Sequence, residues 1–384
     1  MEARNLDSVT SDTPSMRSTG YDALVVPVVP ATATLSIDDL ATMHLMRRYR
    51  APLVIAVLLL IAACESGLAP RQIGVGAGRV TLLEDFSARQ VFPASNWWNL
   101  DVSSAPLDPQ SDALIDWISG RTAQNPTATR TLHPEFGPPP HGIPYVGVGA
   151  SQGLLPVDFS PYGSDSDPGG PGRPPGYPIP TQARTTPNYI EGGVVGGGSN
   201  GDRHLIIIDR DRWILFETWA TRWNAATGRW TAGSGATFDL SSNARRPEGW
   251  TSADAAGLAI FPGLVRRDEV VASGPITHAF RVTVRATNGY VWPASHRAGN
   301  IIGAPPMGTR LRLKASVDIS GYPAEVRKIF QAMKTYGLIV ADNGADMYVT
   351  GTMDPGWDND VLNPAFHSLT ADDFEVVQLG WGRP

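Results

Sequence analysis

The sequence predicts a mainly β protein, an antiparallel β-sandwich or jelly roll made of successive hairpins with one or two packed helices. Glycine and proline number 40 and 33 among 384 residues, which suits a chain with many turns. Short runs of β-branched and aromatic residues alternate with these turns. Hydrophobic residues make up 42% of the chain, enough for a substantial buried core.

The first predicted hairpin covers residues 201–219, in which two runs rich in β-branched and aromatic residues flank a short charged turn. With a two-residue loop between the strands, His204 lies opposite Glu217. Because strand side chains alternate between two faces, Trp219 and Trp223 fall on the same face as Glu217. A polar pair at the rim of a sheet is the alternative interpretation of His204 and Glu217.

A second hairpin is predicted around Asn288-Gly289, because this dipeptide is typical of a two-residue type I′ turn. Its strands cover residues 278–287 and 290–296, and one of their faces carries two arginines, a tryptophan and a histidine. Such a face suits an acidic or hydroxyl-rich ligand, or else it is simply solvated. The four residues are Arg281, Arg285, Trp292 and His296. A third hairpin is predicted over residues 338–350.

Two helices are predicted, over residues 108–120 and 323–337. Each has apolar residues at helical spacing and ends at a glycine, and the second begins with a proline. Residues 249–258 are typical of a capped helical turn. Asp254 falls in its first turn, where a carboxylate caps the helix or, alternatively, serves as a catalytic group.

The N-terminal region resembles a bacterial lipoprotein signal peptide. Residues 46–50 are basic, residues 51–63 form an apolar run too short to span a bilayer comfortably, and Ile61-Ala62-Ala63-Cys64 matches a lipobox. The resemblance implies that Cys64 is lipidated as the first residue of the mature protein. It also implies that the protein is anchored by this lipid in the bacterial cell envelope, at the outer membrane or the cell surface.

These signals divide the chain into four parts. Residues 1–45 are a disordered leader or a start-site artefact, and residues 46–63 are the signal peptide. A glycine-rich tether follows over residues 64–90. Residues 91–384 are expected to form a single β-rich domain.

Five further segments share a common likeness. They cover residues 92–99 (FPASNWWN), 201–204 (GDRH), 233–243 (GSGATFDLSSN), 249–264 and 335–344 (TYGLIVADNG). Together they resemble a group of secreted bacterial proteins described only as hypothetical proteins or lipoproteins, over roughly residues 90–378. No activity, fold or catalytic residue is attached to that group, so the resemblance implies none for this chain.

Charge and cysteine content narrow the range of partners. The chain has 31 basic and 37 acidic residues, a net charge of −6, and nothing in this balance indicates a nucleic-acid partner. A single cysteine excludes an intramolecular disulfide and a cysteine-based metal site. Asp354, Asp358 and Asp360 lack the spacing of a calcium loop. We therefore expect no metal, no cofactor and a monomeric protein.

The face predicted around Glu217 indicates carbohydrate chemistry. Tryptophan rings stack on sugar rings, and carboxylates or imidazoles such as that of His204 move protons. The sequence therefore predicts an enzyme that acts on a polysaccharide or oligosaccharide, with a glycoside hydrolase favoured. Glu217 would be one of its two acid/base carboxylates, and three residues are candidates for the other: Asp202, Asp239 and Asp254.

Two alternatives remain open. In a polysaccharide lyase, His204 or His278 would be the base, and Arg281 and Arg285 would neutralise the carboxylate of a uronate. A non-catalytic lipoprotein that binds carbohydrate or scaffolds the envelope would need only the tryptophan faces. Fold alone does not separate these classes.

Overall fold

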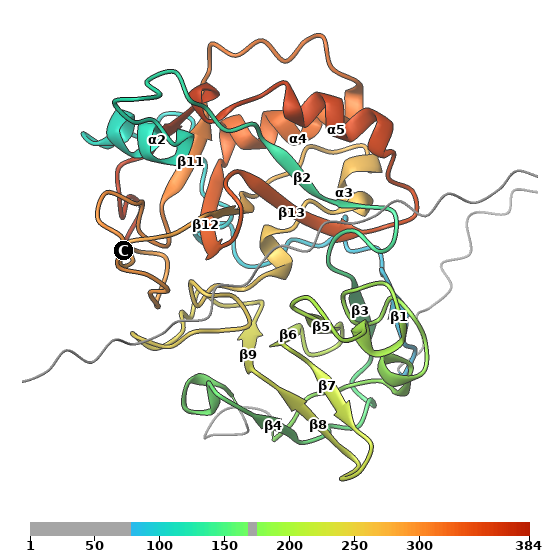
Figure 1. The fold of residues 1–384 in the computed structure, drawn as a ribbon. Helices are drawn as coiled ribbons and strands as arrows, with labels where there is room; N and C mark the ends of the chain where they lie inside the picture. Colours follow the sequence, from blue (N-terminus) through green and yellow to red (C-terminus); the bar gives the residue numbers. More distant parts are fainter. Residues whose placement is uncertain (1–77, 168–174) are drawn as a thin grey trace, which may run out of the picture. The chain divides into compact units, whose positions relative to one another are not determined.

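The structure is a computed structural model that describes residues 78–167 and 175–384 (Figure 1). The leader, the signal peptide and Cys64 lie outside the described residues. The described residues belong to one compact unit. Within the described ranges, no helix has the length and apolar character needed to cross a membrane.

The mainly β class is confirmed, because fourteen strands form three sheets in the part of the chain that the structure describes. The five-stranded sheet has the order β1 (Thr81–Leu82), β3 (Tyr145–Val148), β5 (Leu205–Asp209), β6 (Ile214–Trp219) and β9 (Ser234–Asp239). The six-stranded sheet has the order β14 (Phe374–Val376), β11 (Arg310–Leu313), β12 (Leu338–Asn343), β10 (Phe280–Val284), β13 (Tyr348–Met353) and β2 (His133–Gly137). The three-stranded sheet has the order β4 (Val157–Phe159), β8 (Arg229–Ala232) and β7 (Arg222–Asn224).

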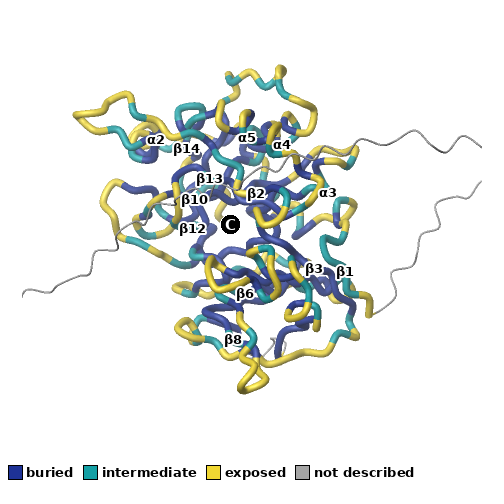
Figure 2. The backbone as a smooth tube through the Cα atoms, turned by 45° about the vertical axis from the view of Figure 1, so that its right-hand side comes forward, coloured by how far each residue is buried: buried dark blue, intermediate teal, exposed yellow. Residues whose placement is uncertain are grey.

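The sheets are layered in a way that is consistent with a β-sandwich. One face of the five-stranded sheet, with Ile207 and Phe216, packs in one core with Trp230 of the three-stranded sheet. The opposite face, with Ile206 and Leu215, belongs to the main core, which also contains the six-stranded sheet. Figure 2 shows the central strands of both larger sheets as buried. Strand pairing is mixed rather than wholly antiparallel, since β3 and β5, β4 and β8, β10 and β12, and β13 and β2 run parallel.

The first hairpin is present, with a register two residues away from the predicted one. Asp209 pairs with Ile214, so Glu217 lies opposite Ile206 and not opposite His204. The cause is a wider loop over residues 210–213. In this loop the Asp209 carboxylate accepts the backbone N–H groups of Asp211 and Arg212, at 3.1 and 3.0 Å. An even shift leaves every side chain on its predicted face.

The second and third predicted hairpins are wrong. β10 is a central strand with β12 on one side and β13 on the other, so both of its edges are already paired. The chain therefore leaves the sheet after Val284, and Asn288 instead forms an isolated bridge with Asn300. The strands of the third predicted hairpin, β12 and β13, are separated by β10. Burial of the five β10 residues outweighs the local turn preference of Asn288-Gly289.

Both predicted helices are confirmed, as α2 (Ser111–Ser119) and α4 (Ala324–Thr335). Gly120 ends α2 in the left-handed region at φ 76°. The sequence did not predict the short α3 (Arg267–Val271) or α5 (Asn359–His367), which contains a proline. In Figure 1, α4 and α5 lie beside the six-stranded sheet, and α4 contributes Phe330 and Met333 to the main core.

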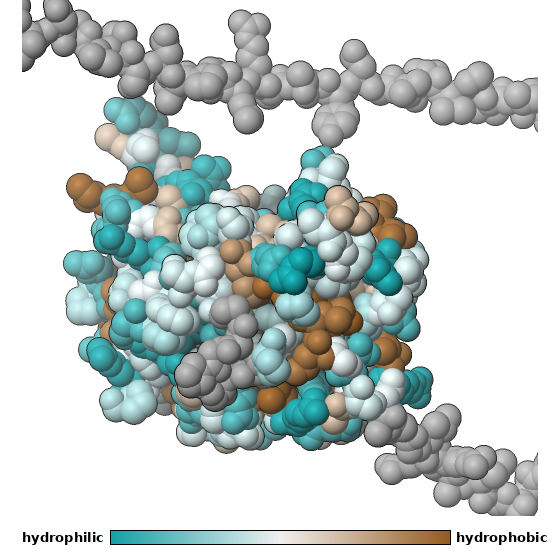
Figure 3. Space-filling model, turned by 90° about the horizontal axis from the view of Figure 1, so that it is seen from below, coloured by the Kyte–Doolittle hydropathy of each residue, from teal (hydrophilic) through white to brown (hydrophobic). Residues whose placement is uncertain are grey.

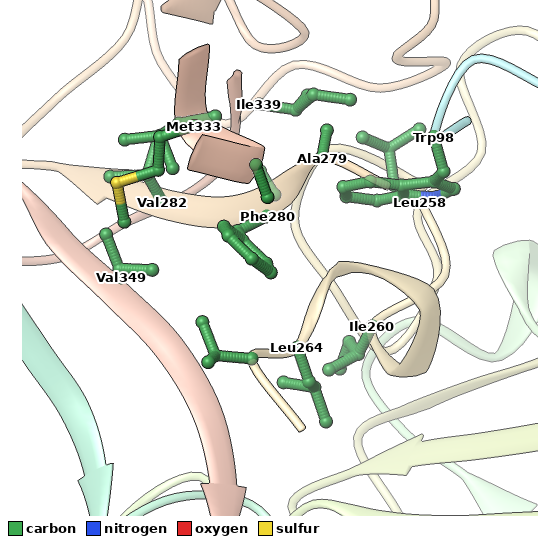
Figure 4. Packing of buried hydrophobic residues seen from close by; sticks show 14 of the residues in the cluster. Trp98, Leu258, Ile260, Leu264, Ala279, Phe280, Val282, Met333, Ile339 and Val349 are labelled. Carbon is green, nitrogen blue, oxygen red and sulfur yellow. The ribbon is translucent and has the colours of Figure 1, made fainter. Parts of the chain in front are cut away.

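Two segments differ from their predicted structure. The folded part begins before residue 91, because β1 pairs with β3 and Phe86 is buried in the main core, so residues 81–90 are not a tether. Residues 249–258 contain no helix and continue into a 3₁₀ turn at Phe261–Gly263. Figure 4 shows Leu258 on the side of Trp98, and Ile260 and Leu264, which flank this turn, on the side of Phe280 of β10; all belong to the main core.

The surface is mainly hydrophilic on the face shown in Figure 3, with apolar side chains gathered in a few groups. Exposed large apolar residues are spread along the described chain, for example Leu107, Val194 and Ile302. Exposed apolar residues are normal on soluble proteins. We therefore base the search for a functional site on cavities and buried charges.

Candidate functional site

A cavity of about 600 Å³ is lined by four of the residues that sequence analysis singled out. Strands from both larger sheets contribute to it, Trp219 from the end of β6, Ser234 from the start of β9 and Asp342 from the end of β12. Its complete lining is Tyr162, Asp202, Trp219, Ser234, residues 251–255, residues 296–300, Asp342 and Asn343. Four predicted site residues therefore meet in one place: Asp202, Trp219, Asp254 and His296.

The aromatic wall of the cavity is formed by Trp219 and Tyr162, whose ring centroids lie 6.2 Å apart. Gly233 makes room for the indole, because a Cβ at this position would lie 2.2 Å from the Trp219 ring. The Asp202 carboxylate accepts the Trp219 Nε1 hydrogen at 2.9 Å, and the Asp202 carbonyl accepts the backbone N–H of Ala220 at 2.7 Å. These bonds hold an exposed carboxylate beside an aromatic ring.

Arg281 of β10 lies beneath the cavity and connects its acidic groups. Its Nε and Nη2 donate to the two carboxylate oxygens of Asp254 at 2.8 and 2.9 Å. Nη2 also donates to Asp342 at 3.0 Å, and Nη1 donates to the Thr350 hydroxyl at 2.6 Å. Burial lowers the pKa of Arg281, but Asp254 and Asp342 outweigh it and the net shift is upward. Arg281 is thus a buried, permanently charged residue that binds two carboxylates.

Asp254 does not cap a helix. Its side chain is fully buried in the bidentate ion pair with Arg281, and burial raises its pKa while the guanidinium opposes that rise. The surrounding segment is tied to β12 by the bond from the Ala256 N–H to the Ala341 carbonyl at 2.9 Å. Asp254 therefore positions Arg281 beneath the cavity and has no free oxygen for a reaction.

Asp342 is the ionisable group at the cavity wall with a strongly shifted pKa. Burial, reinforced by the negative charge of Asp254, raises the pKa of Asp342 to about 7. Its side chain remains 27% exposed, so a ligand in the cavity can reach it. Asp202 lines the same cavity, and its negative charge also contributes to the raised pKa of Asp342.

His296 contributes an imidazole to the same cavity. Its Nδ1 is 2.8 Å from the Ala255 carbonyl, an acceptor that requires the proton to sit on Nδ1. No hydrogen bond to Nε2 is found among residues 78–167 and 175–384. Nε2 is thus the ring nitrogen that remains for a ligand.

Glu217 and His204 lie behind the cavity and do not line it. The Glu217 carboxylate is fully buried and accepts the backbone N–H groups of Ile260 and Phe261 at 2.9 and 2.8 Å. Burial raises the pKa of Glu217 to about 8, and burial lowers the pKa of His204 to about 4. The face of β6 that carries Glu217 is a core face, so the predicted open cleft at His204 and Glu217 is wrong.

The remaining predicted site residues are dispersed. Asp239 is exposed and lies at the far end of β9, since it pairs with Ile214 while Ser234 pairs with Trp219. Trp223 packs edge to face on Trp230 in the three-stranded sheet. Three others bind elsewhere: Arg285 pairs with Asp346, Trp292 packs on Trp97, and His278 bonds to Glu269.

These placements weaken the basis of the lyase alternative. Both arginines that were expected to neutralise a substrate carboxylate are already bound to carboxylates of the chain, Arg281 to Asp254 and Asp342, and Arg285 to Asp346. His278 is bonded on both ring nitrogens, to the Ala279 carbonyl at 2.9 Å and to Glu269 at 2.8 Å. Neither expected base therefore faces the cavity.

Sequence reasoning missed Asp342, Tyr162 and Glu191. Asp342 precedes Asn343-Gly344, a combination typical of a turn, which hid its position at the end of a strand. Glu191 lies in a glycine-rich stretch, where it accepts the backbone N–H of His204 at 3.1 Å, and burial raises its pKa to about 7. No local sequence signal marks such long-range pairs.

Comparison with known proteins gives no functional lead, since no family model, no curated protein and no solved structure matches this chain. The resemblance to secreted bacterial lipoproteins therefore stays a prediction. In the part of the chain that the structure describes, no group of three or more histidine, cysteine, aspartate or glutamate side chains is arranged to hold a metal ion.

Proposed function

We propose that the protein is a glycoside hydrolase that acts on a polysaccharide, with Asp342 as the general acid and Asp202 as the second carboxylate. The observation that supports this most strongly is the contrast between two carboxylates on one aromatic-lined cavity. Asp342 is partly buried with a pKa of about 7, whereas Asp202 is exposed. Glycosidases need such a pair, one carboxyl that donates a proton and one carboxylate that acts as nucleophile or base.

The other residues of the cavity serve substrate binding in this mechanism. Trp219 and Tyr162 offer rings on which the apolar face of a sugar can stack. Arg281 keeps Asp342 in place through the bond at 3.0 Å. His296 lines the same cavity, and its Nε2 offers a hydrogen-bonding partner for a sugar hydroxyl. Glu217, which the sequence favoured as the acid, is replaced in this role by Asp342 because Asp342 can be reached.

The test is a screen of neutral and acidic polysaccharides for the release of reducing ends. Wild type should release them from at least one substrate, and Asp342→Asn should not. The matched control is Asp239→Asn, which changes an exposed carboxylate outside the cavity and should retain full activity. Unsaturated products that absorb in the ultraviolet would assign a lyase instead. Binding of a glycan without any product would assign a carbohydrate-binding lipoprotein.

We also propose that the mature protein is anchored in the bacterial cell envelope by a lipid on Cys64. The basis is the apolar run that ends in Ile61-Ala62-Ala63-Cys64. Cys64→Ala should release the protein from the membrane fraction or block removal of the signal peptide. An unchanged distribution and an unchanged mobility in gel electrophoresis would contradict the anchor.

A further inference from the structure

Two histidines from distant parts of the chain meet where α5 packs on β2. His133 begins β2, and His367 is the last residue of α5. The His133 Nδ1 and the His367 Nε2 lie 2.9 Å apart, although 234 positions separate the two residues in the sequence. Phe366 of α5 also packs edge to face on Phe136 of β2, with ring centroids 5.6 Å apart. The packing of these two elements therefore brings two imidazole nitrogens together.

The ring of His133 is held by two contacts. It stacks on Tyr348 of the neighbouring β13, with centroids 4.4 Å apart and planes at 18°. Its Nε2 lies 3.0 Å from the Thr131 hydroxyl, which can accept the Nε2 proton and so leave the Nδ1 lone pair free. Histidines that bind a metal commonly donate their other ring N–H in this way. Burial, followed by the charge of His367, lowers the pKa of His133, which favours the neutral imidazole that a metal requires.

His367 supplies the second nitrogen from an exposed position. It ends α5, and the carboxyl end of a helix carries a partial negative charge that favours a cation. Because the side chain is exposed, solvent can reach the pair of nitrogens. Water can therefore supply further ligands to an ion that the two imidazoles bind.

We propose that His133 and His367 together bind a divalent transition-metal ion, Cu²⁺, which joins α5 to β2. Metal–imidazole bonds are about 2.0–2.1 Å long, so two nitrogens 2.9 Å apart subtend an angle of about 90° at the ion. That angle suits adjacent positions of a square-planar Cu²⁺ site, whereas tetrahedral zinc needs nitrogens about 3.4 Å apart. Imidazole is a suitable ligand for Cu²⁺, which binds most tightly among the divalent first-row metals.

This inference goes beyond the proposed hydrolase, because neither histidine lines the cavity. β2 is the edge strand of the six-stranded sheet, so the ion would fasten this edge to the helix that packs on it. Two protein ligands are fewer than the three or four of a usual zinc site. The site is thus compatible with the lack of any larger cluster of metal-binding side chains among the described residues.

The test measures Cu²⁺ binding to the full chain, purified without a histidine tag, by titration calorimetry and electron paramagnetic resonance. The main variant is His367→Gln, which removes an exposed imidazole at a helix end. The second variant is His133→Phe, since a phenyl ring can keep the stacking on Tyr348. The matched control is His141→Gln, which removes an exposed histidine outside this pair. A further variant, His296→Gln, removes the imidazole of the cavity. Circular dichroism verifies the folding of each variant.

Wild type should bind one Cu²⁺ ion, with a resonance splitting that indicates two nitrogens. Loss of an outer hydrogen bond costs a metal site about 10–100-fold in affinity, and loss of a ligand should cost at least as much. His367→Gln and His133→Phe should therefore bind Cu²⁺ at least about tenfold more weakly. The ion should also raise the melting temperature of wild type but not of His367→Gln, because a ligand that binds only the folded state stabilises it. His141→Gln and His296→Gln should bind as wild type does.

Three results would overturn the proposal: no binding of Cu²⁺ to wild type, a splitting from a single nitrogen, or equal affinity in wild type and His367→Gln. Loss of binding in His296→Gln alone would assign the ion to the cavity and would overturn it as well. None of these outcomes depends on whether a polysaccharide is cleaved. Failure of the metal site and failure of the hydrolase proposal are therefore distinguishable.

Discussion

Burial raises the pKa of two carboxyl groups, Asp342 and Glu217, but only Asp342 can be reached from the cavity. The pKa of Asp342 is raised to about 7 and that of Glu217 to about 8. Asp342 remains 27% exposed at the cavity wall, while Glu217 is fully enclosed and bonded to two backbone amides. The comparison teaches that a raised pKa prepares a carboxyl for proton transfer only where a substrate can approach it.

The largest expected effect is on kcat, which should fall far more when Asp342 is replaced than when Glu217 is replaced. Asp342→Asn should lower kcat by roughly 10² to 10⁴, because it removes the proton donor while it keeps the size of the side chain. Glu217→Gln should lower kcat less than about tenfold, because its oxygen can still accept the Ile260 and Phe261 amides. Steady-state kinetics on a substrate found by the polysaccharide screen measures both values. A larger loss for Glu217→Gln than for Asp342→Asn would reverse the assignment.

The next effect concerns the arginine beneath the cavity. Arg281→Met should destabilise the fold by about 3–5 kcal/mol, because Asp254 would be left as an unpaired buried charge. Arg229→Met is the matched control, since Arg229 pairs with Asp158 where both side chains are about half exposed, at 46% and 52%. We expect a much smaller loss there, because water solvates both charges. Urea denaturation measures both. Equal losses of unfolding free energy in the two variants would show that the buried ion pair of Arg281 contributes no more to stability than the control pair.

A smaller effect is expected in the pH dependence of stability. The folded state raises the pKa of Glu217 from an ordinary value near 4.5 to about 8 and therefore binds more protons than the unfolded state between these values. The stability contributed by this group is full below pH 4.5 and is lost as pH rises through 8. Glu217→Gln should therefore lose less melting temperature between pH 6 and pH 9 than wild type. An identical loss in both proteins would contradict the raised pKa.

The smallest effect distinguishes two tryptophans that the sequence placed on one face. Trp219 lines the cavity, whereas Trp223 packs on Trp230 in the three-stranded sheet. Trp219→Ala should weaken oligosaccharide binding by about 1 kcal/mol, roughly fivefold in Kd. Trp223→Ala should leave Kd unchanged once its folding has been verified. Weaker binding in Trp223→Ala alone would place the substrate on the other side of the five-stranded sheet.

Local sequence signals predicted the elements whose structure is decided locally. The helical spacing and the terminal glycines located α2 and α4, and the alternation of apolar residues located β5 and β6. The side-chain face of Glu217 followed from this alternation, but not its partner, because the Asp209 carboxylate stabilises a wider loop than a two-residue turn. The open or closed nature of that face depends on what packs against it, which the hairpin sequence does not contain.

Long-range pairing decided the rest. Asn288-Gly289 is a strong local turn signal, yet β10 pairs with strands that follow it by more than fifty residues. The ion pair of Arg281 with Asp254 and Asp342 likewise joins three distant segments. Four residues of the cavity could be named from the sequence because of their chemical type, but Asp342 could not, since a typical turn sequence follows it.

The pH dependence of kcat tests the central claim most directly. A general acid must be protonated, so with Asp342 in this role kcat should fall as pH rises through about 7. The same alkaline fall should persist in Glu217→Gln, because Glu217 does not reach the substrate. A wild-type profile that falls near pH 8, together with the disappearance of that fall in Glu217→Gln, would identify Glu217 as the acid and contradict the account.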